Sequence, residues 1–412
     1  MSFLSNFCAP NGRGRLNMII TPKFRGFICT TSHPTGCEYN VRQQVEYVKK
    51  QKKVNGAKKV LVIGASTGYG LSSRIAAAFG CGAATIGLFF EKPASGNRTA
   101  SAGWYNSAAF EKIAREEGLY AKSINGDAFS NEIKQQTIEL IKKDLGKVDM
   151  VIYSLASPRR THPDTGEVFN SVIKPIGPAY TSKTVDFHTG KVEDITIEPA
   201  NEDEIKQTVA VMGGEDWSMW MDALKKADVL ENNAITVAYS YVGPEMTHAV
   251  YREGTIGKAK DDLEATAYQI TEKLKDIGCK AYVSINKAVV TQASAAIPVI
   301  SLYISILFKI MKNKNVHEGC IEQMYRMFED RLYSSDMKLD SKGRICMDDW
   351  EMDYDVQTEV SKLWDEASND NIADISDVEG YRAEFFRLFG FGFDAVDYSA
   401  DVDINVMIDS IE

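Results

Sequence analysis

Hydrophobic and polar positions between residues 58 and 157 alternate between two kinds of segment. Short runs that are apolar almost throughout, such as KKVLVIG, are bounded by glycine or polar residues and predict buried strands. Longer segments between them carry apolar residues at helical spacing. The predicted strands are 58–64, 83–91, 120–126 and 148–157, and the predicted helices are 68–80, 106–118 and 131–146, with Asn131 as a possible N-cap. Strands that alternate with helices form a parallel sheet covered on both faces, so the pattern predicts a Rossmann-like, doubly wound α/β fold.

The alternation stops between residues 158 and 202, where proline, glycine, threonine and aspartate recur every few positions. Such turn signals predict an inserted loop with short strands, a lid over one end of the sheet. The regular pattern then resumes with two helices at 203–229, a strand at 234–241, a long helix at 255–277 and a last central strand at 280–290.

The longest apolar run extends from Ala293 to Phe308 and contains Pro298. It is shorter than the ~20 residues that span a bilayer, so we expect a buried helix rather than membrane insertion. From about residue 316 the chain is acidic, with aromatic residues and leucine at helical spacing, which predicts helices packed on the same body. We therefore expect a flexible extension at 1–17 and one enlarged domain at 18–412.

Composition narrows the classes of function. The net charge of −10 comes without a basic stripe, which argues against nucleic-acid binding. The five histidines are scattered and no Cys-x-x-Cys occurs, so we predict no metal site. Seven irregularly spaced cysteines indicate reduced thiols in a cytoplasmic protein. The first 17 residues lack the apolar region of a signal peptide.

The motif VLVIGASTGYG places Gly64, Gly68 and Gly70 after the first predicted strand and at the start of the first predicted helix. Glycines at this point let the backbone approach a pyrophosphate, which the helix N-terminus attracts. The spacing is G-x-x-x-G-x-G, and the strand–turn–helix context supports dinucleotide binding. Ser66 and Tyr69 lie in the same loop and are further candidates; Tyr69 could stack on adenine or simply pack on the helix.

Acidic residues at the ends of the next strands are candidates for the nucleoside part of the cofactor. Glu91 can accept hydrogen bonds from both ribose hydroxyls and would repel a 2′-phosphate, which favours NADH over NADPH, although Lys92 follows directly. Asp127 can accept from the adenine amino group or serve as a turn carboxylate. The neighbouring candidates for cofactor binding are Phe90, Ala128, Leu155 and Ala156.

The segment YSYVGPEMTHAVYREGTIGKAK, residues 239–260, contains the candidate catalytic groups. A reductase needs an acid near a developing oxyanion, and a tyrosine beside a lysine that lowers its pKa can serve. The common Y-x-x-x-K spacing is absent, but Tyr251 precedes both Lys258 and Lys260. Helix geometry favours Lys258, which lies about two turns away. The glycines at 254 and 257 indicate, however, that the helix begins after Tyr251, so the spacing leaves both lysines open.

Nine motifs together carry a family resemblance: RGFICTTSHPTGC, VLVIGASTGYGL, GWYNSAAF, NGDAFS, YSLASPRRT, VMGGEDW, the segment 239–260, NKAVVTQASAAIP and HEGCIEQM. From about Met18 onward the chain resembles the trans-2-enoyl-CoA and enoyl-[acyl-carrier-protein] reductases of the FabV type, enlarged short-chain dehydrogenase-like oxidoreductases. The resemblance implies an NADH-dependent enoyl reductase of fatty acid biosynthesis and lipid metabolism. It also implies a monomer that acts on an enoyl thioester carried on CoA or acyl carrier protein.

The same resemblance implies roles for particular residues. Its Y-x8-K signature falls on Tyr251, the active-site acid, and Lys260, its partner. Tyr241 would share the pocket and touch the thioester oxygen. The implied cofactor contacts are Tyr69 near the adenine, Glu91 at the adenosine ribose, Asp127 and Ala128 beside the adenine, and Val289, Val290 and Thr291 at the nicotinamide amide and phosphates.

Two other functions use subsets of these features. A carbonyl reductase of the short-chain dehydrogenase type would use the same tyrosine and lysine with NAD(P)H on a ketone. A non-catalytic dinucleotide sensor would keep the glycine loop but would have no need of the tyrosine and lysine. A ketone substrate panel separates the first from an enoyl reductase, and tight NADH binding without turnover would support the second.

Overall fold

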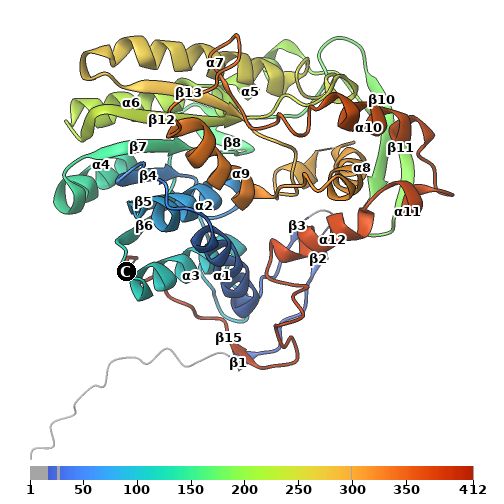
Figure 1. Ribbon diagram of the computed structural model, residues 1–412, viewed down its shortest axis with the longest axis horizontal. Coiled ribbons are helices and arrows are strands. Elements are labelled where there is room, and N and C mark those ends of the chain that lie inside the picture. Colours follow the sequence, from blue (N-terminus) through green and yellow to red (C-terminus); the bar gives the residue numbers. More distant parts are fainter. Residues whose placement is uncertain (1–16, 26–27, 298, 412) are drawn as a thin grey trace, which may run out of the picture.

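The computed structural model describes residues 17–25, 28–297 and 299–411, and its centre is a seven-stranded parallel sheet (Figure 1). The strand order from one edge to the other is β14 (Ile345–Cys346), β13 (Lys280–Ile285), β12 (Leu230–Ser240), β7 (Val148–Tyr153), β4 (Lys59–Ile63), β5 (Ala84–Phe89) and β6 (Ala121–Asn125). The order reverses between β4 and β7, as in a doubly wound fold. The predicted Rossmann-like α/β class is confirmed.

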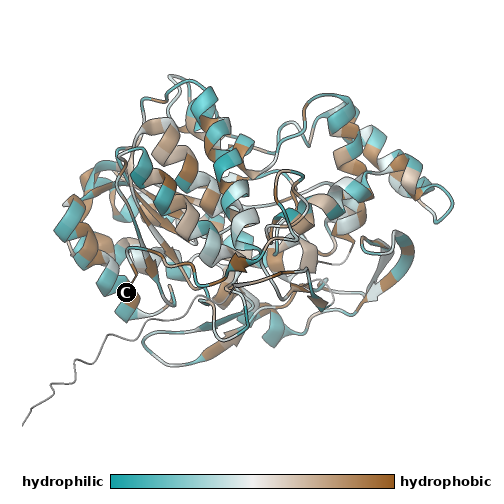
Figure 2. Cartoon of the chain, turned by 90° about the horizontal axis from the view of Figure 1, so that it is seen from below, coloured by the Kyte–Doolittle hydropathy of each residue, from teal (hydrophilic) through white to brown (hydrophobic). Residues whose placement is uncertain are grey.

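The strands are buried on both faces, and successive side chains divide between two hydrophobic clusters. In β4, Val60 and Val62 belong to one cluster while Leu61 and Ile63 belong to the other. The first cluster includes side chains of α8 (Ile300–Asn313) and α9 (Cys320–Arg326), and the second includes those of α4 (Asn131–Leu140), α6 (Glu215–Lys226) and α7 (Thr255–Lys273). A third cluster joins α1 (Pro34–Lys50), α2 (Gly68–Ile75) and α3 (Ala102–Glu116). Figure 2 shows the outer helices alternating between hydrophilic and hydrophobic residues, as such one-sided packing requires.

The predicted helices of the first half are present, with adjustments at their ends; α3, for example, begins at Ala102, four residues before the predicted start. The N-cap of α4 is Ser130, whose hydroxyl accepts the Ile133 N–H at 3.2 Å, and not Asn131. The physical reason is that Ser130 has the extended backbone of a cap, while Asn131 is already helical and donates to Asp164. The helix after the glycine loop continues beyond α2 as a π-helical turn, Ala76–Gly80.

The insertion predicted at 158–202 consists of two hairpins followed by α5 (Glu202–Met212). The short one pairs β8 (Arg159–Thr161) with β9 (Val168–Asn170), and the long one pairs β10 (Tyr180–Asp186) with β11 (Lys191–Ile197). The long hairpin stands beside α8 and α10 (Tyr354–Glu366) at the far side of the molecule from β6 (Figure 1). Lys183 Nζ connects this hairpin to the C-terminal region by donating to the Ala367 carbonyl at 3.0 Å.

The apolar run forms a buried helix, but the predicted start at residue 293 was wrong. Helix α8 begins at Ile300, and a single 3-10 turn covers Ser294–Ala296 before it. Ile297 is extended (φ −97°, ψ 121°), which is the conformation that a following proline imposes on the residue before it. The helix is buried along nearly its whole length.

The C-terminal region adds α9, α10, α11 (Ile372–Ile375) and α12 (Val378–Arg387), as the helical spacing predicted. It also contributes strand β14, which the sequence did not predict. After α12 the chain is mainly irregular and ends beside β6, where Ser410 Oγ accepts the Ser123 N–H at 2.7 Å. On the way it forms β15 (Val402–Asp403), which pairs with β1 (Asn17–Met18), while β2 (Phe24–Arg25) pairs with β3 (Ile28–Cys29).

The largest hydrophobic cluster extends from Ile20 to Ile408, and the single-domain organisation stays a prediction. The extension predicted at 1–17 lies almost wholly outside the described residues. Within the described ranges, no helix is long and apolar enough to cross a membrane, and no group of three or more His, Cys, Asp and Glu side chains is placed to hold a metal ion. The six cysteines in those ranges are free thiols.

Candidate active site

The glycine loop connects β4 to α2 at the carboxyl edge of the sheet. Gly64 has φ +88°, and a Cβ there would lie 1.9 Å from the Ser154 carbonyl oxygen, so only glycine fits. A Cβ at Gly70 would lie 1.8 Å from the Gly64 carbonyl oxygen, so this glycine permits the close approach of helix to strand. The geometry is that of a dinucleotide phosphate loop, with the N-terminus of α2 facing the space above the sheet.

Glu91 is held in place at the end of β5 by the two neighbouring strands. Its Oε1 accepts from Ser66 Oγ at 2.7 Å, and its backbone N–H donates to Asn125 Oδ1 at 2.7 Å. A side chain on Gly103 would collide with this carboxylate, because a Cβ there would lie 2.0 Å from Glu91 Oε1. Lys92 is exposed. Glu91 is thus fixed next to the phosphate loop, where an adenosine ribose would need an acceptor.

Asp127 and Ala128 follow β6. Asp127 Oδ1 accepts the Phe129 N–H at 3.0 Å, which is the turn role that the sequence left open, and its adenine role stays a prediction. The Ala128 carbonyl accepts from Lys134 Nζ and from Trp220 Nε1, both at 3.1 Å, so its backbone is fixed from two helices. Phe90 is 77% exposed next to Glu91, as an aromatic ring that borders an open nucleoside site would be.

A cavity of about 210 Å³ opens at the carboxyl ends of β7, β12 and β13. It brings together the predicted residues Tyr69, Leu155, Ala156, Tyr241, Tyr251, Lys260, Val289 and Thr291. The side chains of Ile297, Ile300 and Ile304 supply an apolar wall. Residues that lie far apart in the sequence thus surround one space that is lined by both polar groups and isoleucines.

The structure separates the two candidate lysines. Lys260 borders the cavity, and its Nζ donates to the Tyr239 carbonyl at 3.0 Å. Lys258 is exposed on the other side of α7. The helix begins at Thr255, as the two glycines indicated, so counting turns from Tyr251 has no meaning here. Burial lowers the pKa of Lys260 to about 8, with Glu264 acting in the opposite direction.

The hydroxyls of Tyr241 and Tyr251, two of the tyrosines that line the cavity, differ in what they contact. Tyr241 donates its hydroxyl hydrogen to Glu351 Oε1 at 2.9 Å. The Tyr251 hydroxyl has no hydrogen-bond partner among the described residues and borders the cavity. The rings meet edge to face, with centroids 4.8 Å apart and an interplanar angle of 72°.

The expected lowering of a tyrosine pKa is not what the structure shows. Burial raises the pKa of Tyr251, and the nearby Glu351 raises it further. Tyr251 therefore keeps its proton and is available as a neutral hydrogen-bond donor. The sequence reasoning failed here because it counted the charge of the lysine and left out the burial of the tyrosine.

Tyr69 lies at the cavity rather than beside Glu91 and Asp127. Its hydroxyl donates to the Lys287 carbonyl, and its ring lies 5.9 Å from that of Tyr239. This position argues against the adenine contact, and we reassign Tyr69 to the wall of the cavity. The reason is that Tyr69 lies on the first turn of α2, which turns its side chain toward β12.

The turn from Val289 to Thr291 lies between this cavity and a second one of about 190 Å³. Ser294 Oγ closes the turn, accepting the Thr291 N–H at 2.9 Å and donating to the Val289 carbonyl at 2.8 Å. The second cavity is bordered by Thr67, Gly68, Val290 and Thr291. The two cavities thus adjoin at Thr291, one beside the phosphate loop and the other beside Tyr251.

Several buried polar atoms at the cavities have no partner among the described residues. They are Ser240 Oγ and Asn286 Nδ2 at the first cavity and Asn106 Oδ1 at the second. Unpaired buried polar groups are costly unless a ligand completes them. They fit a dinucleotide whose nicotinamide end enters the first cavity.

Sequence reasoning missed Ser240 and Asn286, together with Lys287, Tyr303 and Glu351 around the cavity. Ser240 is the last residue of β12 and Asn286 directly follows β13, positions that could have marked them. No local signal marks Glu351, which lies 110 residues after the tyrosine it binds.

Comparison with known proteins agrees with this geometry. Residues 98–333 match the family described as trans-2-enoyl-CoA reductase catalytic region, and residues 19–96 match the NAD(P)H binding domain of trans-2-enoyl-CoA reductase. The chain belongs to the trans-2-enoyl-CoA reductase family. It is 81% identical to the trans-2-enoyl-CoA reductase [NADH] of Ruminiclostridium cellulolyticum, over 96% of this chain and 100% of that one. It is 65% identical to the enoyl-[acyl-carrier-protein] reductase [NADH] of Flavobacterium psychrophilum, with the same coverage.

Two solved structures of the family have the same fold. The Clostridium acetobutulicum trans-2-enoyl-CoA reductase in complex with NADH superposes with a TM-score of 0.93 at 46% identity, covering 96% of this chain and 100% of that one. The Treponema denticola enzyme in complex with NAD gives 0.91 at 49% identity, covering 95% and 100%.

Residues 339–402 match a family segment described as enoyl reductase FAD binding domain, and the structure does not fit that description. Its two strands, β14 and β15, have two residues each, so no strand–glycine turn–helix unit is formed within it. Its inward side chains, such as Val360 and Tyr381, are fully buried in the core. Residues 339–402 border the second cavity only through Glu384, Arg387 and Leu388 and do not border the first. We assign no flavin chemistry to this segment.

Proposed function

We propose that this protein reduces the trans-2 double bond of enoyl thioesters with NADH. The observation that carries the proposal is the cavity in which Tyr251, with its hydroxyl free, and the half-buried Lys260 meet at the carboxyl edge of a dinucleotide-binding sheet. The cofactor, when bound, supplies a hydride from nicotinamide C4 to Cβ of the substrate.

The residues of the chain position the reactants and stabilise the charge that develops. Tyr251 donates a hydrogen bond to the thioester oxygen, where the enolate charge appears, and supplies a proton. Lys260 binds the nicotinamide ribose with its ammonium. Gly64, Gly68 and Gly70 admit the pyrophosphate, and Glu91 receives the adenosine ribose hydroxyls. The isoleucines of α8 receive the acyl chain.

The finer assignments belong to the same proposal. We propose a cytoplasmic monomer that works in fatty acid synthesis, with the acyl group on CoA or on acyl carrier protein. The sparse free cysteines support the reduced compartment. Light scattering of the purified chain tests the monomer, and a single calorimetric unfolding transition tests the one-domain organisation.

The direct test is NADH oxidation by the purified protein with crotonyl-CoA and with matched crotonyl and longer enoyl thioesters of acyl carrier protein. We expect turnover of at least one thioester series and none of a ketone panel. Turnover of ketones only would favour the carbonyl reductase, and tight NADH binding with no turnover would favour the sensor.

A further inference from the structure

A buried carboxylate lies directly behind the catalytic cavity. Glu351 is fully buried and does not border the cavity itself. Its Oε1 accepts from the hydroxyls of Tyr303 at 2.6 Å and Tyr241 at 2.9 Å, and its Oε2 accepts the Ala288 N–H at 2.7 Å. Three donors that converge on one carboxyl group are the arrangement that suits its ionised form, which can only accept.

A buried positive charge accompanies this carboxylate. Burial is the largest influence and raises the pKa of Glu351, while the Lys287 charge and the hydrogen bonds from Tyr303, Ala288 and Tyr241 act in the opposite direction and favour the ionised form. Lys287 is 1% exposed, and its Nζ donates to the Ala288 carbonyl at 2.8 Å. Burial lowers the pKa of Lys287, and Glu351 acts in the opposite direction, so each group favours the charged form of the other. The carboxylate and the 287–288 turn thus form one unit in the cavity wall.

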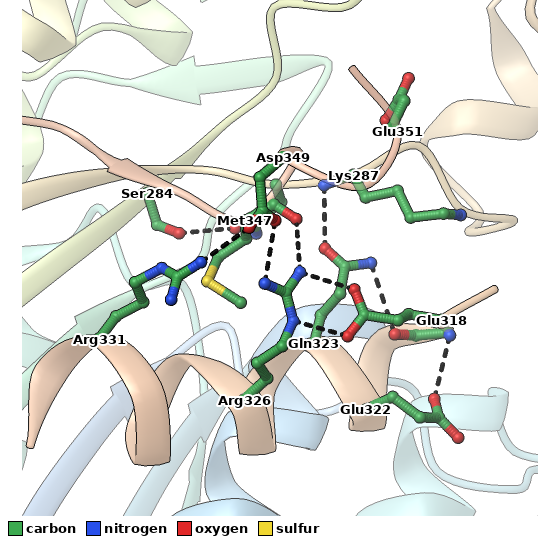
Figure 3. Close-up of polar contacts among 12 residues, drawn as sticks. Ser284, Lys287, Glu318, Glu322, Gln323, Arg326, Arg331, Met347, Asp349 and Glu351 are labelled. Carbon is green, nitrogen blue, oxygen red and sulfur yellow. Dashed lines mark hydrogen bonds and ion pairs between the residues drawn. The ribbon is translucent and has the colours of Figure 1, made fainter. Parts of the chain in front are cut away.

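The segment that carries Glu351 is itself fixed by an ion-pair cluster on α9, shown in Figure 3. Arg326 donates to the Met347 carbonyl and to Asp349 Oδ1, each at 2.9 Å. Glu318 holds the same guanidinium with two bonds of 2.7 Å. The Met347 N–H in turn donates to the last residue of β13 at 2.7 Å. The backbone just before Glu351 is therefore held by both α9 and β13, which fixes the carboxylate behind the cavity wall.

These contacts decide what Tyr241 offers to the cavity. A tyrosine hydroxyl has one hydrogen, and Tyr241 gives it to Glu351, so only its oxygen lone pairs remain. The Tyr251 hydroxyl, by contrast, has no hydrogen-bond partner among the described residues. Because the two rings pack edge to face, holding Tyr241 also fixes the surface against which Tyr251 lies.

We propose that Glu351 is a positioning residue that directs the Tyr241 hydroxyl hydrogen out of the cavity and holds its ring against Tyr251, which makes Tyr251 the hydrogen-bond donor to the thioester oxygen. The inference rests on the proposed function and revises one part of it. Tyr241 acts as a packing surface and an acceptor, in place of the direct contact with the thioester oxygen that the family resemblance implied.

The test begins with Glu351→Gln, which keeps the size of the side chain. A glutamine has one accepting oxygen and one donating NH2, so it cannot satisfy three donors. We expect kcat with crotonyl-CoA to fall about 10- to 100-fold, the cost of one charged hydrogen bond, while KM for NADH changes less than about twofold. In a Tyr241→Phe background, where the contact is already lost, E351Q should lower kcat by less than about threefold.

Tyr303→Phe is the matched control, because it removes the other tyrosine donor to the same Glu351 oxygen and Tyr303 does not border the cavity. It should lower the melting temperature about as much as E351Q and lower kcat less. Two results would overturn the proposal. One is an equal loss of kcat in E351Q and Y303F, and the other is a double variant E351Q/Y241F whose loss of kcat equals the product of the two single losses.

Crystal structures of the wild type and of E351Q give a readout that does not need turnover. We expect the Tyr241 hydroxyl to leave its wild-type position and its ring to shift against Tyr251. If the wild type turns over no thioester, the proposed function is wrong. The crystal structures would still show whether Glu351 holds Tyr241 in place. A Tyr241 that stays in place in E351Q although its hydroxyl no longer contacts residue 351 overturns the proposal for Glu351.

Discussion

The two halves of the site are built in different ways. The cofactor half, from Gly64 to Asp127, takes its residues from three consecutive strand ends, each within a few positions of a strand. The catalytic half collects Tyr241, Tyr251 and Lys260 from one segment but completes them with α8 and with Glu351 from the C-terminal region. The cofactor half is therefore determined locally, while the catalytic half depends on contacts between distant parts of the chain.

The difference extends to electrostatics. Glu91 is partly exposed and held by hydrogen bonds to neighbouring strand ends. The catalytic groups lie where burial raises the pKa of Tyr251 and lowers that of Lys260. Substitutions in the catalytic half should therefore change kcat, and those in the cofactor half should change cofactor affinity and selectivity.

The largest effect should come from Tyr251→Phe, which removes the free hydroxyl of Tyr251 and keeps the ring. Loss of one donor to a developing oxyanion lowers kcat by about 10²- to 10³-fold. Steady-state NADH oxidation with crotonyl-CoA measures it, and Tyr239→Phe, whose hydroxyl contacts Ser73, is the control. A Y251F variant with wild-type kcat would show that the Tyr251 hydroxyl does not stabilise the developing oxyanion.

Lys260→Met should have the next largest effect, lowering kcat/KM for NADH about 10- to 100-fold through loss of a charged donor. Lys258→Met is the matched control on the exposed side of the same helix, and surface changes of this kind usually alter stability by less than about 0.5 kcal/mol, so kcat/KM should stay near that of the wild type. If K258M were the inactive variant and K260M the active one, the assignment would be reversed.

The pH dependence sharpens this second effect. Burial lowers the pKa of Lys260 to about 8, so the ammonium is present below that pH and is lost as the pH rises through it. The wild-type kcat/KM for NADH should fall above about pH 8, where an ordinary lysine would remain charged. K260M should lack this fall, and a fall that persists in K260M would assign it to another group.

In the cofactor half, Glu91→Ala should raise KM for NADH about tenfold by removing the ribose acceptor. It should also narrow the preference for NADH over NADPH, because the repulsion of a 2′-phosphate is gone. Kinetics with both cofactors measure the change, and Lys92→Ala is the adjacent exposed control. An unchanged cofactor preference in E91A would place the selectivity elsewhere.

The smallest effect concerns the acyl wall. Ile304→Ala should shift kcat/KM toward longer enoyl chains by about fourfold per added CH2 that gains burial. Ile306→Val on the same helix is the control, since Ile306 is fully buried away from the cavity. Kinetics with a chain-length series of enoyl thioesters decide it. A shift of equal size in I306V would show a general loosening of α8 instead of a specific contact.

The two halves also differ in how far the sequence predicted them. Buried strands and their glycine turn have local patterns, so β4 to β7, the loop at Gly64 and the position of Glu91 were all predictable. The two-residue strand β14 has no periodicity to detect. The start of α8 was misplaced because an alanine-rich run looks helical until the restriction imposed by Pro298 is counted.

The catalytic residues show the same limit. The spacing from Tyr251 left Lys258 and Lys260 open, and only the family signature chose between them until the fold placed one in the cavity. Glu351 was beyond prediction because its role depends on the tertiary contact with Tyr241. The pKa of Tyr251 likewise follows from its burial, which no local pattern states.

The most direct test of the account follows the hydride. The purified protein is supplied with NADH that carries deuterium at the transferred position of nicotinamide C4, together with crotonyl-CoA, and the product is analysed by mass spectrometry and NMR. The account predicts butyryl-CoA with one deuterium at Cβ. Deuterium at the former carbonyl carbon, or an unreduced double bond after NADH is consumed, would contradict it.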